Sequence, residues 1–231
     1  ISWNWQETLQ EANARAFTVA KVTNLDLLKT IRQSLDQALA EGKTERWFKS
    51  TLTPVLQKAG WWGRFKTDGI DGPRTVQLGS PRRLSLIYRQ NLQSAYMAGR
   101  WQEQARLSAA RPYLQYVAVL DSRTRPTHAA LNGRVYRFDD PIWRTHYPPN
   151  GWGCRCRVRQ LSEFALKKRG LTVESSEGQL VSKNVFAGAD YETGQKTFVD
   201  VAGVRVLGTN GKPETFFTDP GFSFNAGQAM F

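Results

Sequence analysis

Every histidine and every cysteine of this chain lies in one short stretch. His128, His146, Cys154 and Cys156 all fall between Asp121 and Cys156, and the rest of the 231 residues contains neither residue type. Imidazole nitrogens and thiolate sulfurs are preferred zinc ligands, and a structural zinc site takes four ligands in a tetrahedral arrangement. The sequence therefore predicts a zinc site formed by these four side chains.

The two cysteines are separated by a single residue, Arg155. On an extended strand, residues two apart point to the same face, so both thiols would face one partner. A disulfide between them would close a very small ring with strained geometry. The pair is therefore interpreted either as metal ligands or as two free thiols, and CxC spacing suits a reducing compartment better than a disulfide-stapled secreted fold.

The positive charge of the chain is concentrated around this stretch. The net charge is +12, and residues 81–169 hold 17 Lys or Arg against five Asp or Glu, whereas the flanking regions hold 15 of each. Such a basic region attracts polyanions in a salt-sensitive way, or it is a solvated face that keeps the protein soluble. The residues expected to face nucleic acid are Arg82, Arg83, Arg89, Arg155, Arg157, Arg159, Lys167 and Lys168.

Several helices are expected on the N-terminal side of the His/Cys stretch. Apolar spacing predicts helices over residues 3–21, from the N-cap Asn24 to Gly42, and from the N-cap Thr44 onward with a break or kink at Pro54. A loop is expected over residues 63–80, because Gly, Asp and Pro are frequent there. A long helix beginning after Ser80 and running to about residue 109 is expected to carry the cluster.

Short strands are expected to surround the His/Cys residues. They cover residues 113–120, 135–138 and 154–161, with a helical turn at 127–131 and a basic helix at 162–169. Residues 171–231 are expected to be a C-terminal extension with strands at 196–201 and 204–207 and an irregular tail over 216–231. The predicted fold class is α+β: a helical region (1–62), a loop (63–80), a core of long helix plus small antiparallel β module (81–170) and a C-terminal extension (171–231).

The sequence contains no apolar run of the ~20 residues that a membrane span needs. It shows no signal peptide and begins without Met, so we expect a fragment or a processed chain.

Several short motifs follow one another in order along the chain. They are residues 91–100 (NLQSAYMAGR), Asp121-x-Arg123 followed by His128, Leu131-x-Gly133, Asp140-Pro141-x-Trp143, Pro148-Pro149-x-Gly151 and Cys154-Arg155-Cys156, with AFTVAK at 16–21 and DPGFSFN at 219–225. In this order the chain resembles the phage Mu protein F-like family of minor head proteins, also called phage head morphogenesis proteins. The resemblance covers nearly the whole chain and is strongest over residues 81–160.

The resemblance implies a structural role without enzymatic activity. A member of this family is expected in the virion, in the capsid interior or portal region, and in the host cytoplasm during assembly. Its expected partners are the portal, scaffold or major capsid protein, with non-specific DNA contact. Asp121, Arg123, Gly133, Pro148, Pro149 and Gly151 are its expected structural motif residues, and Asp121, Arg123 and Arg125 are expected to form a charge network that fixes a turn.

The chain departs from its relatives at the metal ligands. Many relatives carry Cys-x-x-Cys where this chain has Arg125 to His128, which leaves His128, Cys154 and Cys156 with His146 or Asp121 as a fourth ligand. The alternative is a metal-free cluster in which His128 bonds Asp121 and the thiols pack as small apolar groups. Two further hypotheses are a metal-dependent nuclease using His128 beside Asp121, and a non-specific DNA-binding module.

Overall fold

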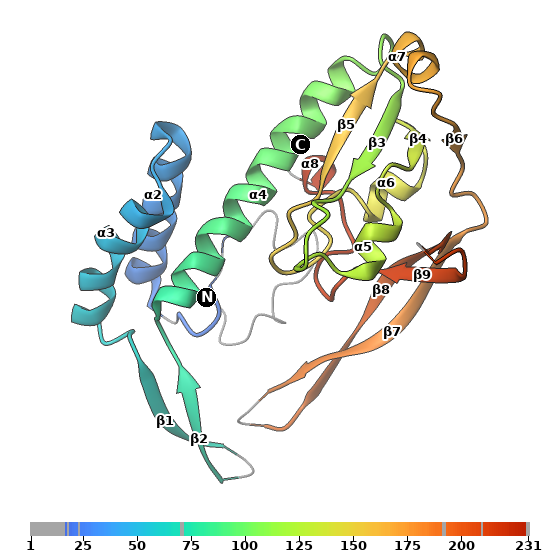
Figure 1. Ribbon diagram of the computed structural model, residues 1–231. Coiled ribbons are helices and arrows are strands. Elements are labelled where there is room, and N and C mark those ends of the chain that lie inside the picture. The colour runs from blue at the N-terminus through green and yellow to red at the C-terminus, as the bar shows by residue number, and fades with distance from the viewer. Residues whose placement is uncertain are drawn as a thin grey trace. The chain divides into compact units, whose positions relative to one another are not determined.

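The computed structural model describes residues 17, 19–22, 24–69, 72–190, 193–208 and 210–229 (Figure 1). The helix expected over residues 3–21 lies mostly outside these residues, and the described residues at its end are not helical. The chain divides into two compact units: residues 1–92 with 186–198 form unit 1, and residues 93–185 with 199–231 form unit 2. Helices and mainly antiparallel sheets make up both, which confirms the α+β class.

Unit 1 is built on two capped helices and the first half of a third. α2 (Leu25–Glu41) begins at Asn24, whose side chain accepts a hydrogen bond from the Leu27 amide, and ends at Gly42 in the left-handed conformation. α3 (Glu45–Lys58) begins at Thr44 and continues past Pro54 rather than ending there. Both helices therefore start where the sequence predicts, because their caps are local signals.

The core of unit 1 lies between these helices and the N-terminal half of α4 (Pro81–Arg106). Ile31, Phe48, Leu52, Leu56 and Leu84 are fully buried in it. The expected loop at 63–80 is wrong: β1 (Arg64–Gly69) and β2 (Gly72–Gln77) pair there as an antiparallel hairpin. Most of the hairpin's side chains are exposed, so it shows no alternation of apolar and polar residues that would reveal a strand.

Unit 2 contains a four-stranded sheet of order β5-β3-β4-β6. Its strands are β3 (Tyr113–Val117), β4 (Val135–Arg137), β5 (Arg157–Leu161) and β6 (Val173–Glu174). β3 pairs with both β4 and β5 in antiparallel fashion, as expected, whereas β4 and β6 are parallel. Short helices connect the strands: α5 (Pro126–Ala130), α6 (Ile142–Thr145) and α7 (Glu163–Lys168), the last capped by Ser162.

The second half of α4 runs beside β5, the edge strand of this sheet (Figure 1). Gln93 donates to the carbonyl of Cys156 at 2.8 Å, and Gln104 and Arg100 both donate to the carbonyl of Val158. Gln160 on β5 in turn donates to the carbonyl of Gln104 at 2.7 Å. The helix therefore supplies the hydrogen bonds that a further strand would otherwise make.

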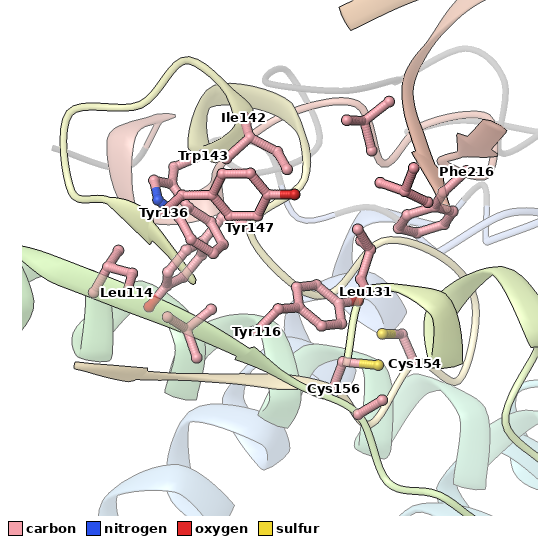
Figure 2. Close-up of a cluster of buried hydrophobic side chains, with 14 of the residues drawn as sticks. Leu114, Tyr116, Leu131, Tyr136, Ile142, Trp143, Tyr147, Cys154, Cys156 and Phe216 are labelled. Carbon is pink, nitrogen blue, oxygen red and sulfur yellow. The ribbon is translucent and has the colours of Figure 1, made fainter. Parts of the chain in front are cut away.

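An aromatic core fills unit 2 beside the sheet (Figure 2). Trp143, Tyr116, Tyr147 and Phe216 are fully buried, and Trp143 packs edge-on against Tyr147 and Tyr136. Cys154 and Cys156 belong to the same cluster, with their sulfurs beside Tyr116 and Leu131.

The C-terminal extension is more ordered than its sequence indicates. β7 (Leu180–Ala189), β8 (Lys196–Leu207) and β9 (Pro213–Phe217) form a three-stranded sheet, and α8 (Ala226–Ala229) follows. The two short strands expected at 196–201 and 204–207 are one continuous strand, and β7 and β9 were not expected. Among the described helices, none has the length and apolar composition required to cross a membrane.

Packing of α8 leads to a paired prediction on stability. A β-carbon added at Gly227 would lie 2.6 Å from Cγ of Trp101 on α4, and that indole is itself buried. We expect Gly227→Ala to lower the free energy of unfolding by about 1–3 kcal/mol through overpacking. Gly99→Ala, two residues before Trp101 and with open space around it, is expected to raise it by about 0.5–1 kcal/mol. Denaturant titration of both variants checks this, and equal effects would contradict it.

Candidate metal centre

Three of the four predicted metal ligands converge in unit 2. His128 lies on α5, and Cys154 and Cys156 lie in the irregular segment just before β5. The Nδ1 atom of His128 lies 3.4 Å from Sγ of Cys156 and 3.7 Å from Sγ of Cys154. All three side chains are buried, and their ligand atoms lie within 4.8 Å of one another.

These separations match what a tetrahedral zinc ion requires. With a Zn–S bond of about 2.3 Å and a Zn–N bond of about 2.0 Å, two ligands at the tetrahedral angle are about 3.5 Å apart. The two measured nitrogen–sulfur distances bracket this value. The residues present therefore fit zinc, although the segment that carries the cysteines precedes the strand on which we expected them.

The two thiols are electrostatically coupled. Hydrogen bonding from the Cys156 thiol, and then from His128 and the Asn150 backbone, lowers the pKa of Cys154 well below its usual value. Contact with Cys154, together with burial, raises the pKa of Cys156. A bound divalent cation would deprotonate coordinating thiols outright.

His146 does not join this cluster. Its Nδ1 lies 2.8 Å from Oγ1 of Thr145 and its Nε2 lies 3.3 Å from the carbonyl oxygen of Phe216. A carbonyl only accepts, so Nε2 carries the proton and Nδ1 accepts from the hydroxyl. The Phe216 ring packs against both histidines, at 4.7 Å from His128 and 5.3 Å from His146. His146 is a core residue in this structure, which corrects its assignment as fourth ligand.

Burial of His146 predicts a pH dependence of stability. Desolvation lowers its pKa to about 4. Below the ordinary imidazole pKa of about 6.5 the unfolded chain binds a proton that the folded chain excludes, so the free energy of unfolding falls as the pH drops from 6.5 towards 4. The expected slope from this residue is about 1.4 kcal/mol per pH unit. Denaturation experiments between pH 7 and 4.5 should show this slope, and His146→Gln should reduce it. An unchanged slope in that variant would contradict a buried, neutral His146 as its cause.

The charged residues around the cluster pair differently from expectation. Arg155 holds Asp121 through two hydrogen bonds of 2.6 and 2.7 Å, and Arg123 lies 3.5 Å from the same carboxylate. Arg125 instead pairs with Asp219 at 3.0 Å and donates to the carbonyl of Trp152. The expected charge network therefore contains Asp121 and Arg123 but not Arg125. The expected bond between His128 and Asp121 is also not formed.

The tail residue Asp219 was not predicted as part of the site. It accepts from Arg125 and from the Trp152 amide, and so connects the C-terminal segment to the segment before Cys154. A β-carbon at Gly151 would lie 2.7 Å from Cγ of Asp219, which explains the glycine there. Asp219 is the first residue of the DPGFSFN motif, and that motif was the sequence signal that could have placed Asp219 at the site.

The remaining motif residues shape the turns on either side. Gly133 has a positive φ of 86° and its amide donates to the carbonyl of Tyr116, which closes the turn into β4. Pro148 and Pro149 are buried and joined by a cis peptide bond. The next residue, Asn150, is fully buried and accepts from the Tyr116 hydroxyl at 2.9 Å.

The predicted basic residues divide into exposed and engaged side chains. Arg82, Arg157, Arg159 and Lys168 are exposed and pair with no described residue. Arg89, Arg155 and Lys167 form ion pairs with Glu45, Asp121 and Glu163, respectively. Arg83 is partly buried, donates to the carbonyls of Gln77 and Leu78, and stacks over the Trp61 ring. Arg83 therefore stabilises unit 1 rather than facing solvent.

Comparison with known proteins identifies the family. The model of the phage Mu protein F like proteins matches residues 29–159. The "Mu-like prophage FluMu F protein" of Haemophilus influenzae is 46% identical over all 231 residues, which cover 54% of that protein. A protein of Escherichia phage Mu, provisionally named capsid assembly protein F, is 45% identical over the whole chain and 52% of its own length.

The chain spans about half the length of these curated relatives. No solved structure matches it. The family match covers more than half of the chain, including the long helix, His128 and both cysteines. This chain belongs to the family of phage Mu protein F like proteins.

Proposed function

We propose that this chain is part of a minor head protein that acts in head assembly of a Mu-like tailed phage, near the portal and the packaged DNA. The name of the Escherichia phage Mu relative supports a role in capsid assembly. The observation that supports proximity to DNA is the exposure of unpaired basic side chains. Arg157 and Arg159 alternate with the buried Val158 along β5 and therefore point to the same solvent-facing side.

Contacts of this kind are electrostatic and carry no sequence preference. An arginine that neutralises a phosphate releases condensed counterions, so binding weakens linearly with the logarithm of the salt concentration. Among the described residues of unit 2, no acidic side chain pairs with Arg157 or Arg159, so neither arginine would have to break an ion pair to reach a phosphate.

The assembly role is tested by quantifying the full-length protein in purified heads and in assembly intermediates. We expect a low, constant copy number, and absence from both would overturn the proposal. For DNA contact, Arg157→Gln with Arg159→Gln should weaken duplex binding and lower the salt slope by about 2. Arg137→Gln is the matched control, because Arg137 is exposed but paired with Asp139.

We further propose that the cluster of His128, Cys154 and Cys156 binds zinc as a structural ion. Bound there, the ion would connect α5 to the segment that leads into β5, two pieces of chain 26 to 28 residues apart. A hydrolytic ion also requires a general base beside its bound water. Asp121, which the nuclease hypothesis places beside His128, is held by Arg155 and does not contact His128. The arrangement thus favours an ion that holds the two chain segments together over an ion that catalyses hydrolysis.

A further inference from the structure

We infer that the metal held by His128, Cys154 and Cys156 takes its fourth ligand from solvent, as a small inorganic anion admitted through the cavity beside the cluster. This inference rests on the zinc proposal above and concerns what completes the site. Structural zinc sites usually close with four protein ligands, whereas sites with three keep one position for an exogenous ligand.

The described part of the chain offers three ligands and no fourth. The group of His, Cys, Asp and Glu ligand atoms within 4.8 Å of one another contains only His128, Cys154 and Cys156 among the described residues. His146 is occupied by Thr145 and Phe216, and the Asp121 carboxylate is held by Arg155. The Arg125 guanidinium, which cannot ligate a cation, lies beside the cluster, with its Nη1 3.4 Å from Nε2 of His128.

One cavity opens onto all three ligands. It has a volume of about 120 Å³ and is lined by His128, Cys154 and Cys156 together with Arg123, Arg125 and Arg155. A cavity needs only about 10–15 Å³ to hold a water molecule, so this one has room for a small anion and several waters. Tyr116 and Phe216, which pack against the cluster from the core, are not part of the cavity wall.

The charge of the cavity wall selects an anion. A zinc ion with two thiolates and one neutral imidazole carries no net charge, so the surrounding side chains decide which ligand is attracted. Three guanidinium groups line the cavity, and two carboxylates, Asp121 and Asp219, pair with them. Arg123 has the weakest pairing: its side chain is 72% exposed and lies 3.5 Å from a carboxylate that Arg155 already binds twice.

Cobalt(II) substitution with azide as the probe tests this in the full chain. Cobalt reports the number and type of its ligands through its visible absorption. We expect one cobalt per chain, with thiolate-to-metal bands, and a saturable change in the cobalt spectrum on addition of azide. Arg123→Gln should weaken azide binding about two- to fivefold, the scale of one exposed charge interaction. Arg157→Gln, an exposed arginine outside the cavity, should leave it unchanged.

The outcomes separate the two proposals. Failure to bind cobalt stoichiometrically would overturn the zinc proposal and this inference with it. Stoichiometric cobalt with a spectrum that azide does not change would leave the metal site standing and overturn the open position, since no position open to an anion would then exist. An azide response equally weakened by Arg123→Gln and Arg157→Gln would overturn the role of the cavity, because only general surface charge would be acting.

Discussion

Replacing Trp143 by alanine is expected to lower the free energy of unfolding of unit 2 by about 3–5 kcal/mol. The indole is 1% exposed and packs edge-on against Tyr136 and Tyr147. Its Nε1 also donates to the carbonyl of Arg137 at 2.8 Å, and truncation removes that hydrogen bond. The melting temperature of unit 2 should fall by roughly 10 °C for a change of this size.

Trp152→Ala is the matched control for this prediction. Trp152 is the same residue type in the same unit, but its side chain is 39% exposed and packs mainly on Phe222. We expect it to lower stability by about 1 kcal/mol, the usual size of a change near the surface. Thermal and urea denaturation of both variants gives the comparison. A Trp143→Ala chain as stable as the control would show that the aromatic cluster of unit 2 contributes little to folding.

Removal of zinc is expected to have an effect of comparable size. A ligand that binds only the folded chain stabilises it by about 4 kcal/mol when its free concentration is a thousand times its Kd. Chelation of the metal should therefore lower the melting temperature, and Cys154→Ser or Cys156→Ser should remove the zinc-dependent increment altogether. Metal content per chain and melting curves with and without chelator measure both effects.

His146→Gln serves as the control for the metal prediction. Because His146 binds Thr145 and Phe216 rather than the cluster, this variant should retain one zinc per chain and the full chelator effect. Loss of zinc from His146→Gln would place the ion elsewhere. Equal melting temperatures with and without chelator in the parent chain, with both thiols free, would mean that packing alone closes the module.

Local signals account for the parts of the fold that the sequence predicts. α2, α3 and α7 begin at Asn24, Thr44 and Ser162, whose side chains accept from their own first turns. The hairpin at 64–77 and β7 were missed because their side chains are largely exposed on both faces. Pattern reading depends on one buried face, and these strands have none.

Residue type alone predicted which side chains could bind a metal, but not which of them lie together in the fold. Because histidine and cysteine occur only in this stretch, the sequence was enough to predict that His128, Cys154 and Cys156 form one cluster. Their separation from His146 depends on Phe216, a partner 70 residues further along the chain that no spacing rule could supply. The pairing of Arg125 with Asp219 spans 94 residues and is likewise a result of the tertiary fold.

The bonds from α4 to β5 have a consequence for behaviour at high concentration. An open strand edge recruits strands from neighbouring molecules and leads to aggregation. In unit 2 the carbonyls of Cys156 and Val158 already accept from Gln93, Arg100 and Gln104, and the opposite edge of the sheet is the two-residue β6. Copies brought together at high concentration would therefore find no template for sheet growth on this sheet. Replacing Gln93, Arg100 and Gln104 together by alanine should expose such a template and raise the rate of fibril formation without changing the residues of the metal cluster.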